Sequence, residues 1–235
     1  KQIDPYVNFH KIASYEISHY RLIEFIAKTH KPTFLSTGAA TIDEIEWAVN
    51  HYFKNGGKNL TLLQTTAKYP APLESLNINS IVTLKNHFNL PIGLSDHSLN
   101  PIIGPISATA LGATAIEKHF TLNKKLPGPD HSFALDPPEL KEMVQVIRNC
   151  EKCLGSREKI VHDNELELRD FAQRSIQCIK NISKGECFME GVNFAILRSG
   201  KHKKGIHPKF IDILEGKIST RSINVGDGIL ESDYE

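Results

Sequence analysis

The sequence predicts an α/β protein built on a parallel sheet, followed by a small domain that is mostly β. Two observations carry this prediction. From Val7 to about Cys153, short apolar strands alternate with amphipathic helical segments. Beyond residue 170, short β-type runs with glycine turns replace that alternation. Strands separated by helices form right-handed βαβ units with a parallel sheet. A (β/α) barrel and a doubly wound sheet both satisfy the pattern.

Five short apolar segments are predicted as strands: 7–14, 32–38, 59–65, 90–95 and 113–120. Helix signals lie between and after them. Thr41 and Glu44 have the spacing of a capping box, and Asp136, two prolines and Glu139 start another helix, since proline is tolerated in a first turn. Each helix has one apolar face, made of Ile45, Ala48, Val49, Tyr52 and Phe53 in the first and of Leu140, Met143, Val144 and Ile147 in the second.

A charged stretch with a helix-breaking glycine separates the two parts of the chain. It covers 155–170 and predicts a linker. The predicted organisation is therefore an α/β domain at 1–154, this linker, and a small β domain at 171–235.

Composition limits the classes of function. The chain has 235 residues, with 28 Lys+Arg against 27 Asp+Glu and 40% hydrophobic residues. Balanced charge gives no argument for nucleic acid or a membrane surface. No apolar run approaches the roughly 20 residues that span a bilayer, and no signal-peptide pattern is present. We therefore expect a cytoplasmic protein with neither partner. Cys150 and Cys153 have C-x-x-C spacing but no second close pair, so ordinary thiols are expected rather than a zinc or redox site.

The predicted strands share one feature, which is that each ends in polar side chains. These are Lys11, Ser14 and Glu16 after the first strand, Ser36 and Thr37 in the second, Tyr69 after the third, Ser95, Asp96 and His97 in the fourth, and Glu117, Lys118 and His119 in the fifth. The carboxyl ends of parallel strands form the active face of such folds. The lysines offer positive charge and the serines offer hydroxyl donors near helix N-termini, which suits a phosphorylated or carboxylated substrate.

Two histidines end neighbouring strands. His97 and His119 are therefore expected within bridging distance of one divalent metal ion, which would act as a Lewis acid on a carbonyl. The alternative is that each imidazole only makes local hydrogen bonds. A glycine- and proline-rich loop follows the fifth strand and presents Asp130, either as a turn-capping residue or as a carboxylate that binds substrate hydroxyls. No Walker or G-x-G-x-x-G pattern is present, so a nucleotide is not the expected ligand.

In order along the chain, "KIASYEI", "LSTGAAT", "YPAP", "GLSDHS", "GATAIEKHFTL" and "PGPDHSFALDPPEL" resemble the N-acetylneuraminate (sialic acid) synthase family, including its relatives in spore-coat and surface polysaccharide synthesis. In the tail, "RSI" and "KGE" resemble that family's antifreeze-like domain. The resemblance implies a (β/α) TIM-type barrel at 1–154 and an antifreeze-like domain at 171–235. The first segment resembles the fourth barrel strand, so we expect an incomplete barrel with strands 4 to 8, either as part of a longer enzyme or as a truncated product.

The resemblance also implies an activity. Members of the family condense phosphoenolpyruvate with N-acetylmannosamine or a related N-acyl hexose, with Mn²⁺ or a similar ion such as Mg²⁺ or Co²⁺, and form domain-swapped homodimers. By motif position, the implied metal ligands are His97 and His119, and the implied proton-transfer group is Glu16. The implied contacts to phosphoenolpyruvate are Lys11, Ser14, Ser36 and Ser95. Lys118 is expected as a further substrate-binding cation from its position at a strand end, and not from the resemblance. The implied contacts to the sugar are Glu16, Tyr69 and Asp130, together with Arg174 supplied to the other protomer. Asp96 is expected to orient the His97 imidazole.

The sequence departs from the family pattern at two further points. Ala67 stands where a polar residue is usual, and the tail segment 198–205 carries extra basic residues. Two other functions stay open at this stage. One is a non-catalytic sugar-binding or assembly subunit that keeps part of the site, and the other is a metal-dependent aldolase acting on a sugar phosphate.

Overall fold

The computed structural model describes residues 2–235, which divide into two compact units. The first unit ends at Gly155 and the second begins at Ser156. No helix in residues 2–235 is long and apolar enough to cross a membrane.

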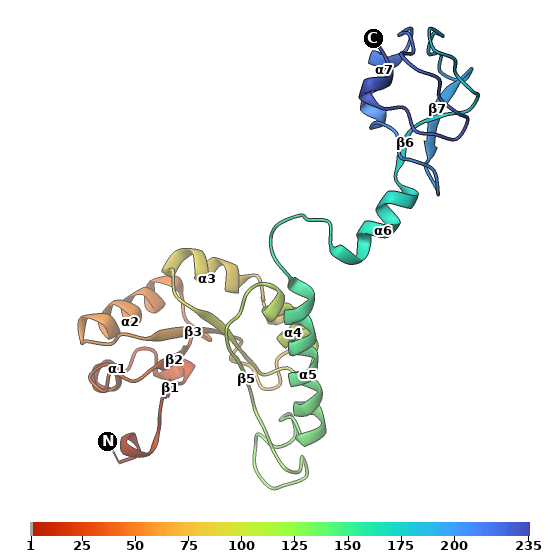
Figure 1. The fold of residues 1–235 in the computed structure, drawn as a ribbon. Helices are drawn as coiled ribbons and strands as arrows, with labels where there is room; N and C mark the ends of the chain where they lie inside the picture. Colours follow the sequence, from red (N-terminus) through yellow and green to blue (C-terminus); the bar gives the residue numbers. More distant parts are fainter. Residues whose placement is uncertain (1) are drawn as a thin grey trace. The chain divides into compact units, whose positions relative to one another are not determined.

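The first unit is built on a sheet of five parallel strands that follow one another in chain order (Figure 1). They are β1 (His10–Ile12), β2 (Thr33–Ser36), β3 (Leu60–Thr65), β4 (Ile92–Asp96) and β5 (Ile116–Lys118). Each observed strand overlaps one of the predicted segments. The strictly sequential order belongs to a barrel rather than to a doubly wound sheet, in which the strand order reverses at a switch point.

The helices follow the strands around one side of this sheet (Figure 1). They are α1 (Tyr20–Ala27), α2 (Ile42–Lys54), α3 (Ser80–Phe88), α4 (Ile103–Ala110) and α5 (Pro137–Leu154), with short 3₁₀ turns η1 (Asp4–Tyr6), η2 (Ser14–Glu16) and η3 (Leu73–Ser75). The predicted capping boxes at the start of α2 and of α5 are both present, which confirms those two helix starts.

The core of this unit lies between the sheet and the helices. Alternate strand residues such as Ile12, Leu35 and Leu94 are almost fully buried there, against helix residues such as Ile23 and Ala48. Successive side chains of a strand point to opposite faces, so the residues between these core positions face the other, concave side of the sheet.

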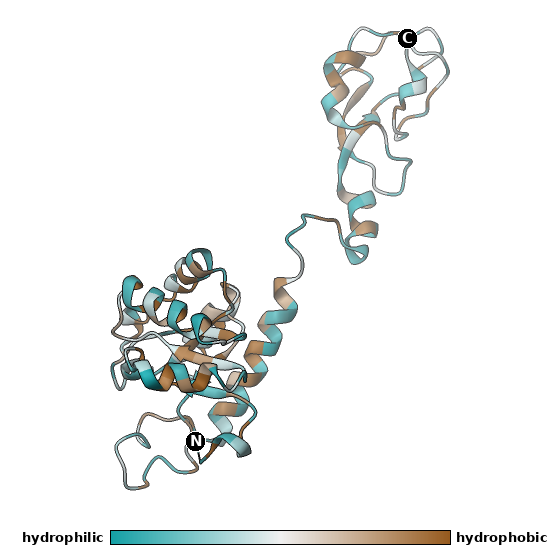
Figure 2. Cartoon of the chain, turned by 90° about the vertical axis from the view of Figure 1, so that its left-hand side faces the viewer, coloured by the Kyte–Doolittle hydropathy of each residue, from teal (hydrophilic) through white to brown (hydrophobic). Residues whose placement is uncertain are grey.

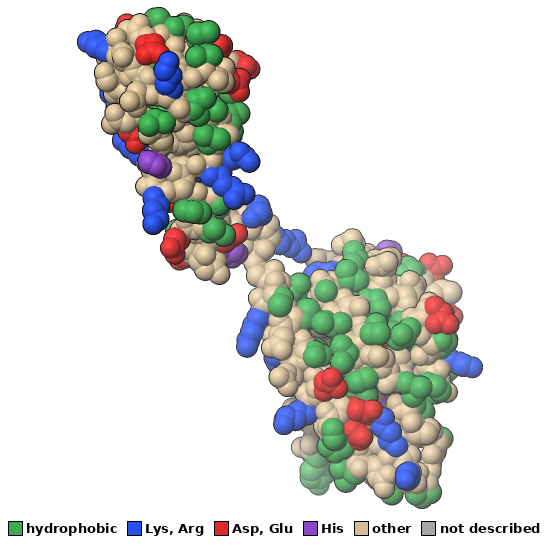
Figure 3. Space-filling model, turned by 90° about the vertical axis from the view of Figure 1, so that its right-hand side faces the viewer, with side chains coloured by type: hydrophobic (Ala, Val, Ile, Leu, Met, Phe, Trp, Pro, Cys, Tyr) green, Lys and Arg blue, Asp and Glu red, His purple; other side chains and the backbone are tan. Residues whose placement is uncertain are grey.

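The amphipathic faces predicted for the helices are only partly buried. Figure 2 shows polar and apolar residues alternating along α5. Of its predicted apolar face, Met143 is buried but Val144 is 45% exposed, and Phe53 of α2 is 38% exposed. Apolar side chains are also exposed elsewhere on the larger unit, and Figure 3 shows one face on which they lie. An open sheet with helices on one side leaves such surface uncovered.

The sheet curls strongly. Lys11 of β1 and Glu117 of β5 lie at opposite ends of the strand order, yet their side chains form an ion pair with Nζ and Oε1 3.2 Å apart. Such a contact requires the two ends of the sheet to turn toward each other. The first unit is therefore a half-barrel, which confirms the prediction of an incomplete (β/α) barrel.

The second unit contains α6 (Asp163–Ala172), the antiparallel strands β6 (Arg174–Cys178) and β7 (Phe194–Arg198), the 3₁₀ turns η4 (Pro208–Phe210) and η5 (Glu231–Asp233), and the short helix α7 (Ile211–Leu214). Its core includes Phe188, Phe194 and Ile229. Gly205 and Gly228 allow two backbone segments to meet, since a Cβ at Gly228 would lie 2.0 Å from the Gly205 nitrogen.

The structure differs from the predicted linker. Residues 163–170 belong to α6, and only 155–162 lack helix or strand. Helix α6 begins where the Glu165 carboxylate accepts a hydrogen bond from the His162 backbone N–H at 2.9 Å, as in a capping box. The acidic part of the predicted linker thus belongs to α6, and its Asp163 and Glu165 lie in the first turn, where negative charge is favourable.

Candidate functional site

The concave face carries a group of polar side chains near the carboxyl ends of the strands, here called the concave cluster: Lys11, Ser95, His97, Glu117 and His119. The Ser95 hydroxyl donates to Glu117 Oε1 at 2.7 Å, and that same oxygen pairs with Lys11. Ser95 Oγ lies 3.5 Å from His97 Nε2. The two imidazole rings lie 5.3 Å apart, centroid to centroid. The structure therefore brings together residues of β1, β4 and β5 that are up to 108 positions apart in the chain.

His97 is held in one orientation by the backbone. Its Nδ1 lies 2.8 Å from the Thr66 carbonyl oxygen. Because that oxygen can only accept, Nδ1 carries the proton and Nε2 presents its lone pair to the cluster. Burial lowers the pKa of His97, and the nearby His119 acts in the same direction, although the Thr66 carbonyl raises it. The neutral imidazole is therefore favoured, which is the form that binds a metal or accepts a proton.

His119 lies at the more open side of the cluster. Its ring packs edge-on against Phe133, with centroids 5.0 Å apart, and its side chain is 32% exposed. Asp130 Oδ2 lies 3.8 Å from His119 Nδ1, with its side chain 60% exposed. The Tyr69 ring is 4.2 Å from His97 and 5.7 Å from His119, so it covers both imidazoles. Burial is the main cause that raises the pKa of Tyr69.

Glu117 is at the centre of the cluster, although no role was assigned to it from the sequence. Its carboxylate accepts from Ser95 and pairs with Lys11, so it joins both ends of the curled sheet. The signal that predicts its position is the alternation of side chains along a strand. Glu117 is two residues before His119 and shares its face, whereas Lys118 must point the other way.

Lys118 lies outside the cluster, which corrects its predicted role as a substrate-binding cation. Its Nζ pairs with Asp96 Oδ2 at 2.9 Å on the helix side of the sheet and donates to the Ser98 carbonyl. The Lys118 side chain is 4% exposed and that of Asp96 is fully buried. Burial is the largest influence on the Lys118 ammonium and lowers its pKa, while the Asp96 carboxylate raises it.

Asp96 does not orient the His97 imidazole either, because the two side chains lie on opposite faces of β4. Its carboxylate accepts from the Ser98 backbone N–H at 2.7 Å and from the Ser98 hydroxyl at 3.1 Å. Asp96 therefore shapes the turn that follows β4. Burial is the main cause that lowers the pKa of His97, and of the influences that raise it the Asp96 charge is smaller than the Thr66 carbonyl, which contacts the ring directly.

The buried serines Ser36 and Ser14 differ in their hydrogen bonding. Ser36, at the end of β2, is 1% exposed, and its hydroxyl oxygen has no hydrogen-bond partner in residues 2–235. A buried hydroxyl without a partner is costly, and it is satisfied when a ligand supplies one. Ser14 is also buried, and its Oγ accepts from the Gly38 backbone N–H at 3.1 Å.

Glu16 and Arg174 also lie outside the cluster. Glu16 is exposed in η2, and the described residues offer its side chain no hydrogen bond or ion pair. Arg174 begins β6 in the second unit, where it is exposed and donates to the Ile196 carbonyl at 3.3 Å. Their expected contacts with a sugar stay predictions.

The two histidines fit a divalent ion as a pair of ligands. His97 presents Nε2 in the neutral form, and His119 lies beside it, which suits a borderline ion. Residues 2–235 contain no group of three or more His, Cys, Asp or Glu side chains placed to hold a metal. The remaining coordination positions would therefore be filled by substrate oxygens or water.

The sequence and the fold both resemble those of known proteins. Residues 2–159 match the family model described as the NeuB family. The chain belongs to the NeuB family. It is 42% identical to the spore coat polysaccharide biosynthesis protein SpsE of Bacillus subtilis, over 95% of this chain and 64% of that protein. It is 39% identical to a pseudaminic acid synthase of Campylobacter jejuni, over 100% of this chain and 66% of that protein.

Solved structures support the same family and fold. The crystal structure of the Bacillus subtilis protein superposes with a TM-score of 0.59, at 41% identity, over 97% of this chain and 67% of that one. A sialic acid synthetase from Leptospira borgpetersenii, in complex with citrate, superposes with a TM-score of 0.64, at 34% identity, over 70% of this chain and 58% of that one. The chain spans 59–66% of the length of three curated relatives, which include the two proteins named above.

Proposed function

We propose that this NeuB-family chain belongs to an enzyme that condenses phosphoenolpyruvate with N-acetylmannosamine or a related N-acyl hexose. The products are a sialic acid-type nonulosonate and inorganic phosphate, for surface polysaccharide synthesis. The relative named as a pseudaminic acid synthase supports a reaction of this kind. The observation that carries the proposal is the concave cluster, in which a cation, hydroxyl donors, a carboxylate and two imidazoles converge at the carboxyl ends of parallel strands.

The anionic substrate is placed by Lys11 and the serines. Lys11 is the positively charged residue of the cluster. When a substrate carboxylate or phosphate enters, the Lys11 ammonium gains a second anionic partner in addition to Glu117. The Ser36 hydroxyl, which has no hydrogen-bond partner within residues 2–235, offers a donor on the same face, on β2 next to the edge strand β1. Ser14 and Ser95 complete the proposed contacts to phosphoenolpyruvate. Lys118 is not among them because its ammonium faces Asp96.

The sugar is placed on the imidazole side. Tyr69 covers His97 and His119, and Asp130 lies at the open rim, where a carboxylate can accept from sugar hydroxyls. In the condensation, C3 of phosphoenolpyruvate bonds to the aldehyde carbon, whose oxygen takes up a proton. Water then adds at C2, loses a proton, and phosphate leaves with its bridging oxygen. Glu16 is the proposed proton-transfer group, and it must turn inward from its exposed position to act.

A divalent ion, Mn²⁺ first, is proposed at His97 and His119, where it would polarise the aldehyde oxygen as a Lewis acid. The protein's own contribution is to hold the His97 imidazole neutral and fixed through the Thr66 carbonyl. We also propose a homodimer in which Arg174 of one protomer reaches the sugar's acyl group bound by the other.

The test is phosphate release from phosphoenolpyruvate in the presence of N-acetylmannosamine and Mn²⁺. We expect release that depends on both the sugar and the ion. His97→Ala should lower the rate by about a hundredfold or more, as for loss of a group at the reacting centre. His87→Ala is the matched control, because His87 is an exposed histidine on α3 whose carboxylate contact, to Glu46, is 3.9 Å long. It should leave the rate unchanged.

Three results would contradict the proposed reaction, and a fourth would contradict the proposed metal ligand. Release without sugar would indicate hydrolysis, and product formed from free pyruvate without phosphate release would indicate an aldolase. A folded chain that binds sugar but releases no phosphate would indicate a non-catalytic binding subunit. An unchanged rate and Mn²⁺ affinity in His97→Ala would contradict the ligand assignment.

A further inference from the structure

The loop of residues 122–134, which follows β5, is tied to the end of that strand by one side-chain pair, Thr121 and His131, here called the loop anchor. The Thr121 hydroxyl oxygen lies 2.8 Å from His131 Nδ1, across 10 positions of the chain. Thr121 is 4% exposed and lies two residues beyond His119. Neither member of the anchor has a role in the function proposed above. The strand that presents His119 therefore also holds the loop.

The hydrogen bonds of Thr121 fix the direction of this contact. Its hydroxyl donates its single proton to the Asn123 carbonyl at 3.1 Å and accepts from the Asn123 backbone N–H at 3.2 Å. The remaining lone pair can only accept, so His131 Nδ1 carries a proton and donates it to Thr121. The Thr121 hydroxyl thus joins the start of the loop, at Asn123, to its later part, at His131.

The later part of the loop has few other ties. Within the part of the chain that the structure describes, the anchor is the only hydrogen bond from residues 127–133 to a residue outside the loop. Pro127 and Pro129 have no backbone N–H to donate. Gly128 has a φ of 141°, and a Cβ there would lie 3.0 Å from His131 Cδ2. The chain therefore passes closely over the imidazole, and glycine permits both the conformation and the approach.

His131 lies between the two loop residues that meet His119. Asp130 precedes it, with Oδ2 3.8 Å from His119 Nδ1. Phe133 follows two positions later and is 7% exposed. Its ring is 5.0 Å from the His119 ring and 5.7 Å from the Tyr69 ring, centroid to centroid. Holding His131 in place therefore holds both the carboxylate and the aromatic ring that border the imidazole side of the concave cluster.

We propose that Thr121 and His131 are positioning residues for the acceptor sugar, and that they act through Asp130 and Phe133. The inference rests on the proposed function, in which Asp130 accepts from sugar hydroxyls. Without the anchor, residues 127–133 open more often, and Asp130 is less often in the position that meets the sugar. The proposed phosphoenolpyruvate contacts lie on or beside β1, β2 and β4, so the effect is confined to the sugar.

The test compares substitutions that remove the hydrogen bond with substitutions that keep it. Thr121→Val and His131→Leu remove it, and they should raise the sugar KM in the phosphate-release assay roughly two- to tenfold, as for the loss of one hydrogen bond. The KM for phosphoenolpyruvate should stay within about twofold, because its contacts are independent of the loop. The double variant should be no worse than either single variant, since both remove the same bond.

The conservative variants distinguish this hydrogen bond from general packing. Thr121→Ser keeps the hydroxyl, and His131→Asn places an amide N–H near the position of Nδ1. Both should recover most of the wild-type sugar KM. Thr114→Val is the matched control, because the Thr114 hydroxyl also donates to a carbonyl, that of Ile92 at 3.2 Å, but at the opposite end of β5 from His119. It should change neither KM.

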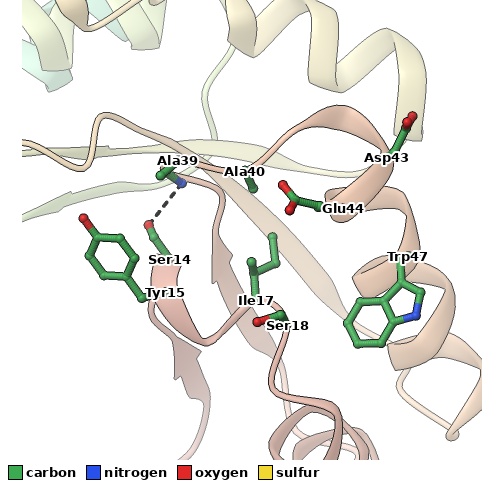
Figure 4. A pocket seen from close by; sticks show the side chains of 10 residues that line it. Ser14, Tyr15, Ile17, Ser18, Ala39, Ala40, Asp43, Glu44 and Trp47 are labelled. Carbon is green, nitrogen blue, oxygen red and sulfur yellow. Dashed lines mark hydrogen bonds between the residues drawn. The ribbon is translucent and has the colours of Figure 1, made fainter.

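Trp47 reports on the rest of the first unit, since it is the only tryptophan of the sequence. Figure 4 shows its indole at the edge of a hollow of about 500 Å³, whose lining comes from residues 14–18 and 38–47. The loop contributes nothing to that lining. Tryptophan fluorescence should therefore be the same in every variant, and thermal unfolding verifies that each variant is folded.

Two further measurements do not require turnover. Calorimetry of N-acetylmannosamine binding, without phosphoenolpyruvate, should rank the variants in the same order as the sugar KM. Trypsin should cut after the exposed Lys125 severalfold faster in Thr121→Val than in wild type, because cleavage follows local opening of the loop. Cleavage after the exposed Arg157 and Lys159, which lie outside the loop, should not change.

The outcomes separate the positioning role from the proposed reaction. A wild-type chain that binds the sugar but releases no phosphate contradicts the reaction alone, and calorimetry then decides the positioning role. That role is overturned if Thr121→Val and His131→Leu bind the sugar as wild type does, even with faster cleavage of the loop. It is also overturned if the KM values for both substrates rise together, if Thr114→Val matches Thr121→Val, or if folded wild-type chain binds no sugar.

Discussion

The two faces of β4 and β5 carry polar groups of similar kinds in opposite states. On the concave face, Ser95 and Glu117 belong to a partly exposed cluster that includes two imidazoles. On the helix face, Asp96 and Lys118 form an ion pair buried from solvent. These residues alternate along the same two strands. A single step along the chain therefore separates a group that can meet a ligand from a group that is already satisfied.

The difference shows how the site is supported. The buried pair closes the turn after β4 through Ser98, and Lys118 directly precedes His119. The backbone that presents both histidines is thus fixed from behind. The side chains in front keep free hydrogen-bonding capacity, as shown by the Ser36 hydroxyl, which has no partner in the described part of the chain. A rigid support behind an incompletely satisfied face is what a binding site requires.

The largest expected effect comes from breaking the pair on the helix face. Asp96→Ala leaves the Lys118 ammonium buried without a partner and removes the acceptor for Ser98. We expect the free energy of unfolding of the first unit to fall by about 3–5 kcal/mol, measured by chemical denaturation. Asp130→Ala is the control on the concave side, and it should change stability by less than about 0.5 kcal/mol because that side chain is 60% exposed.

The double variant Asp96→Leu with Lys118→Met sharpens this prediction. It removes both charges together and should recover most of the lost stability, since a buried pair is often replaceable by apolar residues. If Asp96→Ala alone proves as stable as wild type, the pair does not support the turn.

Much of the fold was predictable from the sequence because its signals are local. The strands, and the capping boxes at Thr41 and Asp136, depend on residues within a few positions of one another. The concave cluster depends on the curl of the whole sheet, which brings Lys11 to Glu117 across 106 positions. No local pattern encodes that distance, so the central role of Glu117 was missed.

The error at Lys118 has a different cause. The strand and its carboxyl end were identified, but the neighbouring residues Lys118 and His119 were both assigned to the site. Alternation along β5 places Lys118 on the face opposite to His119, and the same rule separates Asp96 from His97. The sequence was therefore sufficient to predict which face of the sheet each of these residues occupies. Their hydrogen-bond and ion-pair partners were apparent only from the structure.

A smaller loss of stability is expected from a substitution at Gly93, on the concave face. Gly93 lies two residues before Ser95 on β4, and a Cβ there would be 2.5 Å from the Ala115 carbonyl oxygen and 2.6 Å from Leu63 Cδ2. Gly93→Ala should therefore cost about 1–3 kcal/mol in the free energy of unfolding through overpacking. Equal stability of Gly93→Ala and wild type would show that the sheet opens at this level.

The smallest effect on stability is expected at Glu117, and it is the most informative about function. The pair of Lys11 with Glu117 is 29% and 42% exposed, so Glu117→Gln, which keeps the shape and a hydrogen-bond acceptor for Ser95, should cost less than about 1 kcal/mol in chemical denaturation. Phosphate release should nevertheless fall, because Lys11 and Ser95 lose the charge that holds both side chains at the centre of the cluster. A kinetic loss without a stability loss would distinguish this face from the Asp96 side. Loss of stability comparable with that of Asp96→Ala would instead make Glu117 a structural residue, and the distinction between the two faces would fail.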